Sequence, residues 1–135
     1  MIQVIMLASW NVRGINDPSK QREVSGWIKK SKCSLIGLLE TRIKAKKAEN
    51  IKVGLQRNWM WCNNYQHHHN GRVWVLWDPL VWNITYISSC AQGILCDVKS
   101  LDGRKHFVVG FIYSFNTGLG RQSLWKWLSQ WCTTS

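Results

Sequence analysis

Two apolar stretches that each end in a polar turn constrain this chain more than any other feature. The first runs almost without interruption from Ile2 to Trp10 and continues into Asn11-Val12-Arg13-Gly14. The second covers Leu35 to Leu39 and is followed by Glu40-Thr41-Arg42. Continuous apolar runs of this kind predict strands that are covered on both faces. Because rigid strands carry ligands to one rim of a sheet, the amide and the carboxylate are expected to face one hard, oxygen-preferring cation.

The segment between the two apolar stretches predicts a helix. Asp17 suits the N-cap position, and Pro18 suits the first helical position. Val24, Trp27 and Ile28 then share one helical face, which is the face expected to meet a sheet. The order strand, helix, strand favours parallel neighbours joined by a right-handed crossover.

The rest of the chain predicts a helix, then a run of strands, then a last helix. A weaker helical pattern covers residues 43–57, with three apolar residues inward and four lysines outward: Ile43, Ile51 and Leu55, then Lys44, Lys46, Lys47 and Lys52. Strands are expected over residues 59–63, 73–77, 82–88, 94–99 and 106–113. Asp102-Gly103 predicts a tight hairpin between the last two strands. Apolar residues at helical spacing predict a helix over residues 124–131, and without a linker the chain is expected to form one domain over residues 1–135.

Ten tryptophans are many for 135 residues. Six lie within apolar patterns and are predicted to belong to the core: Trp10, Trp27, Trp74, Trp77, Trp125 and Trp131. Three border polar segments, where stacking on nucleic-acid bases is an alternative to packing: Trp59, Trp61 and Trp82.

The charge is strongly basic and uneven. There are 18 Lys and Arg residues against 7 Asp and Glu, which gives a formal charge of +11. Twelve of the basic residues and four of the acidic ones fall within the first 57 positions. A basic half suggests a polyanionic partner, most often nucleic acid, although a solvated basic surface is the alternative.

The cysteines and the hydropathy bear on the compartment. Five cysteines form no C-x-x-C pair and their number is odd, so reduced thiols in a nuclear or cytoplasmic protein are expected. The short apolar start lacks a basic leader, so no secretion is expected. No stretch approaches the roughly 20 apolar residues of a membrane helix, so no membrane partner is expected.

Five separated blocks of this sequence resemble the endonuclease/exonuclease/phosphatase superfamily, and within it the apurinic-like endonucleases of plant LINE-type (non-LTR) retrotransposons. In that family the first strand ends in W-N-x-R-G and the second in E-T-R/K, as the two strand ends here do. Three further blocks follow in the same order, over residues 71–79, 111–116 and 121–125. The resemblance covers nearly the whole chain.

The resemblance implies an α/β fold, the four-layer α/β/β/α sandwich of the DNase I-like proteins. The family motifs G-D-F/W-N and S-D-H do not occur in these 135 residues. The resemblance therefore implies a partial, C-terminally incomplete domain, the N-terminal half of the sandwich, which ends before its second sheet is complete. Such a half would expose an apolar sheet face and unpaired strand edges, so marginal stability and poor solubility are expected.

The resemblance also assigns candidate site residues. Glu40 and Asn11 match the family residues that hold Mg²⁺, with Mn²⁺ as a possible substitute, and a salt bridge of Glu40 to Arg42 or Arg13 is the structural alternative. Tyr113 matches a tyrosine that hydrogen-bonds the phosphate. Asn116 is a weaker catalytic candidate, because Ser114 stands where the family usually has glycine. Contacts with the nucleic-acid backbone are expected from five basic residues: Arg13, Arg42, Lys44, Lys46 and Lys47.

The function implied by the resemblance is Mg²⁺-dependent hydrolysis of phosphodiester bonds in DNA. In the parent polyprotein a reverse transcriptase would follow on the C-terminal side. Because the water-activating motif does not occur in these residues, the chain is expected to be inactive by itself. Two alternatives remain open: a non-catalytic basic module that binds nucleic acid, and another phosphatase chemistry of the same superfamily.

Overall fold

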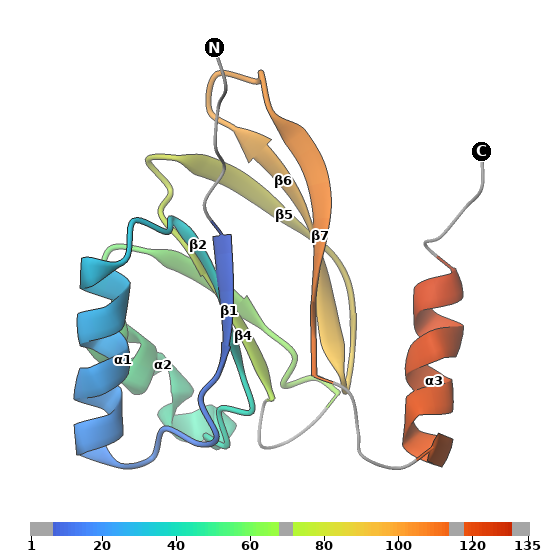
Figure 1. Ribbon diagram of the computed structural model, residues 1–135, viewed down its shortest axis with the longest axis horizontal. Coiled ribbons are helices and arrows are strands. Elements are labelled where there is room, and N and C mark those ends of the chain that lie inside the picture. The colour runs from blue at the N-terminus through green and yellow to red at the C-terminus, as the bar shows by residue number, and fades with distance from the viewer. Residues whose placement is uncertain (1–6, 68–71, 114–117, 131–135) are drawn as a thin grey trace.

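The computed structural model describes residues 7–67, 72–113 and 118–130 of the chain. Within them the fold is mixed α/β, with two sheets and three helices (Figure 1). Sheet A has the strand order β1-β2-β4-β3, with bounds Leu7–Asn11, Leu35–Leu39, Val73–Trp77 and Met60–Asn63. Sheet B has the order β5-β6-β7, with bounds Trp82–Cys90, Gly93–Ser100 and His106–Ile112. The helices are α1 (Pro18–Lys30), α2 (Ala45–Leu55) and α3 (Gly118–Ser129).

The predicted order strand, helix, strand is confirmed over residues 7–39, and residues 2–6 of the first predicted strand lie outside the described residues. β1 and β2 pair in parallel, with Asn11 opposite Leu39. The carboxylate of Asp17 accepts a hydrogen bond from the Ser19 amide, and Pro18 opens α1. Because α1 returns the chain to the start of β2, both strands end at one rim of sheet A. This rim, at the ends of β1 and β2, is called the polar rim below.

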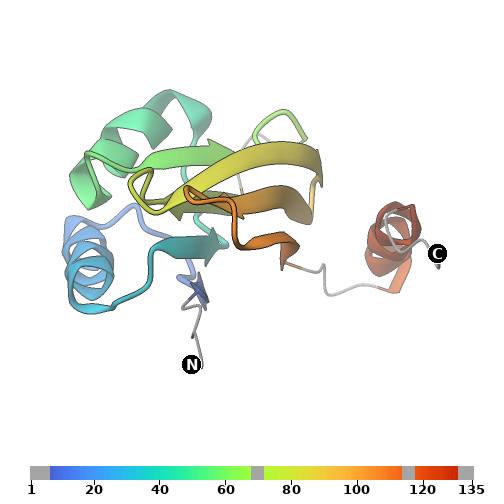
Figure 2. The same ribbon diagram turned by 90° about the horizontal axis from the view of Figure 1, so that it is seen from above.

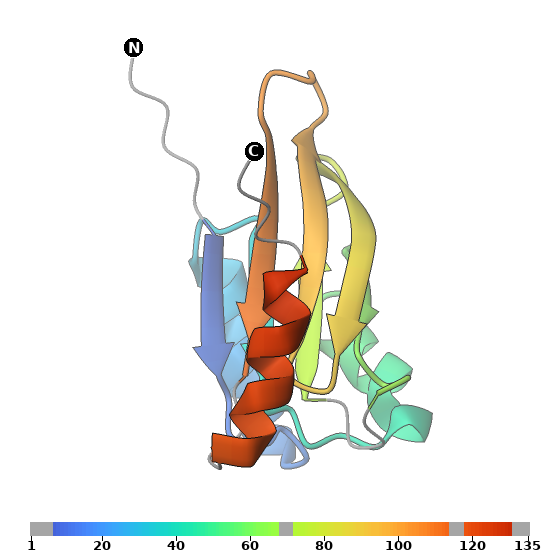
Figure 3. The same cartoon turned by 90° about the vertical axis from the view of Figure 1, so that its right-hand side faces the viewer.

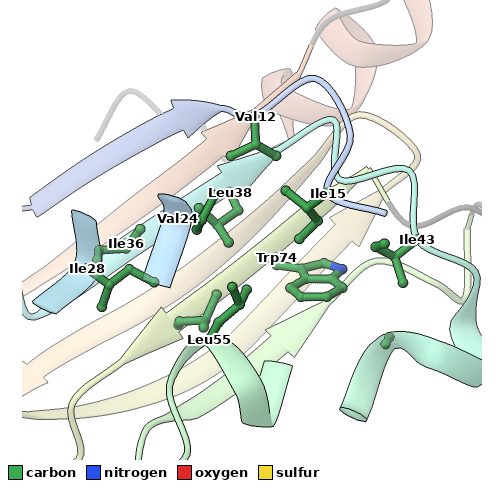
Figure 4. Close-up of a cluster of buried hydrophobic side chains, with 11 residues drawn as sticks. Val12, Ile15, Val24, Ile28, Ile36, Leu38, Ile43, Leu55 and Trp74 are labelled. Carbon is green, nitrogen blue, oxygen red and sulfur yellow. The ribbon is translucent and has the colours of Figure 1, made fainter. Parts of the chain in front are cut away.

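Three apolar clusters hold the layers together. The first lies between sheet A and helices α1 and α2, and Figure 4 shows Val24 and Ile28 of α1 beside Ile36 and Leu38 of β2. The second lies between the two sheets, and the third joins sheet B to α3. Figures 2 and 3 show the result, with α1 and α2 on one side of the strands and α3 on the other.

The expectation of an exposed apolar sheet face is wrong over the centre of sheet A. Leu35 of β2 and Val73 of β4 are fully buried, because sheet B covers them. The contact is closest at Gly37, where an added Cβ would lie 2.1 Å from the ring of Phe111 in β7. The edge strand β1 is less covered, since Leu7 on the same face keeps 42% of its surface exposed.

Two side chains differ from their predicted positions, and a third decides between two alternatives. Lys52, expected to face outward, is buried, and its ammonium donates a hydrogen bond to the Trp59 carbonyl. Trp125, expected in the core, is 60% exposed, while Trp127, two residues later in α3, packs against sheet B. Trp82, for which packing and base stacking were the alternatives, is buried, and its indole N–H donates to the Ser34 hydroxyl (2.7 Å), which agrees with packing.

No helix in the part of the chain that the structure describes is long and apolar enough to cross a lipid bilayer.

Candidate metal and phosphate site

The two polar turns run side by side beyond the ends of β1 and β2. The amide of Val12 donates to the Leu39 carbonyl (3.0 Å), and the amide of Gly14 donates to the Glu40 carbonyl (2.7 Å). One step further, the Ile15 amide donates to the carbonyl of Thr41 (3.0 Å). The parallel pairing of the sheet therefore continues into the turns, which fixes the backbone that carries the candidate site residues.

The backbone of these turns is strained. Arg13, Glu40 and Arg42 have φ values of 53°, 59° and 57°, in the left-handed region that side chains other than glycine rarely adopt. Among the described residues these three are all the non-glycine positions with positive φ. Each costs on the order of 1–3 kcal/mol, and such strain persists only where the surroundings hold it. Its concentration in the polar rim marks this rim as the candidate functional site.

The Glu40 carboxylate lies at the centre of the site. Its side chain is 13% exposed, and it pairs with the guanidinium of Arg42. The Tyr113 and Asn11 side chains also lie near enough to the carboxylate to lower its pKa as hydrogen-bond partners. Burial of the carboxyl opposes ionisation, but the Arg42 pair and these two partners outweigh it and hold the pKa of Glu40 below its ordinary value of 4.5. Glu40 is therefore a carboxylate at neutral pH.

Asn11 and Tyr113 reach Glu40 from different elements. Asn11 is the last residue of β1, and its side-chain Oδ1 accepts a hydrogen bond from the Arg13 backbone amide (3.1 Å), which orients the side chain. Tyr113 follows β7 in sheet B, and its own amide donates to the Gln92 carbonyl (2.7 Å). The structure thus brings together three of the predicted site residues from both sheets, together with the Arg42 salt bridge that was the structural alternative.

The other predicted residues surround this centre or fall outside the described part. Arg13 is exposed in the first polar turn. The three predicted lysines are exposed at the start of α2, directly after the second polar turn: Lys44, Lys46 and Lys47. Lys44 is the N-cap of α2 and forms no side-chain cap, and the first turn of this helix carries no acidic residue. Asn116 lies outside the described residues, so its predicted role stays a prediction.

Sequence analysis missed three residues that support the site. The backbone carbonyl of Arg72 accepts a hydrogen bond from the Glu40 amide. The guanidinium carbon of Arg72 lies 5.4 Å from the centre of the Tyr113 ring. Asn64 is fully buried, and its side-chain Oδ1 accepts hydrogen bonds from the backbone amides of Arg72 and Val73, both at 3.1 Å. The same Asn64 donates to the carbonyls that open the β5–β6 turn, at Cys90 and Ala91.

Gln92 completes this support from the side of sheet B. Its carbonyl holds the Tyr113 amide, and its side chain donates to the Gly120 carbonyl of α3 (2.8 Å). All of these partners are distant in the sequence, so neither periodicity nor a short motif identifies them. Asn64 and Gln92 share buried polar side chains, and this burial cannot be read from a single sequence.

The donor set suits a hard cation. A carboxylate and a side-chain amide supply oxygen ligands, which Mg²⁺ and Mn²⁺ prefer. Over residues 7–67, 72–113 and 118–130 no group of three or more His, Cys, Asp or Glu side chains is placed to hold a metal. Mg²⁺ is commonly bound by one or two carboxylates, its own waters and substrate phosphates, so the single carboxylate of Glu40 fits such an ion.

No protein-family model matches the chain, and a search among curated proteins finds no match either.

Proposed function

We propose that this chain is the N-terminal part of a Mg²⁺-dependent, DNA-cleaving phosphodiester hydrolase of the retrotransposon type, within the DNase I-like sandwich fold. The single observation that carries the proposal is the meeting of Asn11, Glu40 and Tyr113 at one strained rim. Two sheets between outer helices are compatible with the four-layer fold. The exposed basic residues around the rim suit a DNA backbone.

In the proposed mechanism the cation would bind Glu40 and withdraw charge from the phosphate. Asn11, which lies beside the Glu40 carboxylate, would orient it, and the Tyr113 phenol would donate a hydrogen bond to a phosphate oxygen. Glu40 supplies one carboxylate, and the family motif that activates water, G-D-F/W-N, does not occur in these 135 residues. We therefore expect the 135 residues to bind metal and DNA together without measurable hydrolysis of the DNA.

The test measures DNA binding with and without the cation. The affinity for a 20-base-pair fluorescent duplex is measured by anisotropy in EDTA and in rising Mg²⁺, for the native chain, Glu40→Gln and Glu49→Gln. Glu49 is an exposed carboxylate on α2, so its variant controls for the lost negative charge. We expect Mg²⁺ to strengthen binding to the native chain and to Glu49→Gln, and to have no such effect on Glu40→Gln.

The main alternative is a non-catalytic basic module that grips the DNA backbone. The exposed lysines of α2 favour it. For such a module Mg²⁺ only screens the phosphates, so it weakens binding equally in all three proteins. That outcome would refute the proposed metal site and leave the basic module as the function.

A further inference from the structure

The candidate metal ligand is already held by a cation of this chain. The guanidinium of Arg42 pairs with the Glu40 carboxylate two residues before it. Glu40 is nearly buried, whereas 60% of the Arg42 side chain is exposed. The carboxylate is therefore fixed in place, while the arginine has open solvent into which it can turn.

The surroundings of Arg42 are built to place its guanidinium on Glu40. The Asn16 side chain donates to the Arg42 carbonyl (2.8 Å), which helps to fix the left-handed backbone. The arginine stem then passes over Gly14, where an added Cβ would lie 3.2 Å from the Arg42 Cδ. Gly14 has φ +91°, so this passage depends on a glycine in the neighbouring turn.

We propose that Arg42 is an internal substitute for the divalent cation, which must displace the Arg42 guanidinium from Glu40 in order to bind. This inference rests on the proposed function, because it concerns the same carboxylate. The two cations compete for one anion, so the salt bridge weakens metal binding by the free energy needed to break it. Once displaced, the guanidinium is released at the rim, where a phosphate of the substrate is the anion that it can bind next.

The consequence is a site that favours the metal only when the arginine has another anion to bind. Without a phosphate, Arg42 returns to Glu40 and lowers the affinity for the ion. With a phosphate at the rim, the guanidinium leaves the carboxylate at little cost. Metal and phosphate then bind cooperatively, and the cooperativity is reciprocal.

The test measures binding of Mn²⁺ alone, without DNA, by the electron paramagnetic resonance signal of the free ion. The native chain is compared with Arg42→Met, which removes the competing cation, and with Arg13→Met, which removes an equal charge from the same rim. Arg42→Gln serves as a second variant if Arg42→Met folds poorly, as judged by circular dichroism. Glu40→Gln identifies the site, because only binding that it abolishes is counted.

We expect Arg42→Met to tighten the Glu40-dependent binding of Mn²⁺ about three- to tenfold, as for the loss of a partly exposed ion pair. Arg13→Met changes only the general potential of the rim and should have a clearly smaller effect. In the native chain, adding diamagnetic Mg²⁺ should also shift the ¹H–¹⁵N resonance of the Arg42 Nε–H group. Equal effects of Arg42→Met and Arg13→Met, or weaker binding in Arg42→Met, would overturn the displacement while leaving the metal site intact. Binding that Glu40→Gln never affects, in any variant, would instead refute the proposed metal site itself and the displacement with it.

Discussion

Replacing Gly37 by alanine tests the contact that holds sheet B against sheet A. The new Cβ would lie 2.1, 2.7 and 2.9 Å from three atoms of the Phe111 ring, whereas ordinary contacts are 3.4–4 Å. The ring would have to move by more than an ångström, yet Phe111 is only 3% exposed and packs within the inter-sheet cluster. Overpacking of this kind costs about 1–3 kcal/mol. Alanine is favoured over glycine in a strand by roughly 0.5–1 kcal/mol, so a net loss of about 1–2 kcal/mol is expected.

The assay is urea unfolding followed by tryptophan fluorescence, and the decisive comparison is a double-mutant cycle with Phe111→Leu. The smaller side chain leaves room for the new methyl group, so the double variant should lose at least about 1 kcal/mol less than the sum of the two single losses. Gly26→Ala in α1 is the control, because nothing lies within 4 Å of its added Cβ. It should stabilise the chain by about 0.5–1 kcal/mol. Additive losses for Gly37→Ala and Phe111→Leu would refute the inter-sheet contact.

Three further predictions concern the support of the site, the start of α1 and the lysines at the start of α2. Asn64→Ala should lower the free energy of unfolding by about 2–4 kcal/mol in urea titrations, because it leaves one buried amide, one partly buried amide and two partly buried carbonyls without the Asn64 side chain. Asp17→Ala should lower the melting temperature near neutral pH, because it removes the N-cap of α1. Hydrogen bonds from the Ser19 amide and hydroxyl lower the pKa of Asp17. Because the pKa is lowered in the folded chain, the ionised Asp17 stabilises the fold above the ordinary value of 3.8, and this stabilisation is lost as the pH falls below it. The melting temperatures of the native chain and of Asp17→Ala should therefore converge at low pH. Replacing the three lysines at the start of α2 by glutamine should reduce the slope of log affinity against log salt for duplex DNA by about 2–3 (Lys44, Lys46 and Lys47). The control replaces three lysines at and after the end of α1, at the opposite rim of sheet A, and should change this slope less (Lys29, Lys30 and Lys32).

Local patterns predicted the elements well where one force dominates. β2 and β4 match their predicted bounds of residues 35–39 and 73–77, because both are buried on two faces and their apolar runs have sharp ends. The Asp17-Pro18 pair likewise placed the start of α1. Side-chain positions in the less apolar helices were harder to predict. Lys52 has a long apolar stem that packs inward when its ammonium finds a carbonyl, and helical periodicity does not register this possibility.

Part of the candidate site could likewise be predicted from local patterns, and part could not. Asn11 and Glu40 stand at the ends of adjacent parallel strands, so their proximity follows from the predicted pairing. Tyr113 comes from the other sheet, and only the resemblance suggested that it would join them. The residues that secure this meeting, Asn64 and Gln92, act through contacts across 8 to 31 positions of the sequence. No local pattern encodes contacts of that range, so they required the structure.

The strain in the polar rim and the Arg42 pair have one physical origin. A left-handed Glu40 turns its carboxylate back toward the rim, and a left-handed Arg42 turns its guanidinium toward that same carboxylate. Hydrogen bonds from the neighbouring turn to the carbonyls of Glu40, Thr41 and Arg42 hold both conformations. A chain that needed only a stable turn would avoid three strained residues there, because glycine or asparagine adopts these angles at lower cost. The strain is therefore best explained by the side chains that it positions: one carboxylate fixed at the rim, and one guanidinium that can leave it.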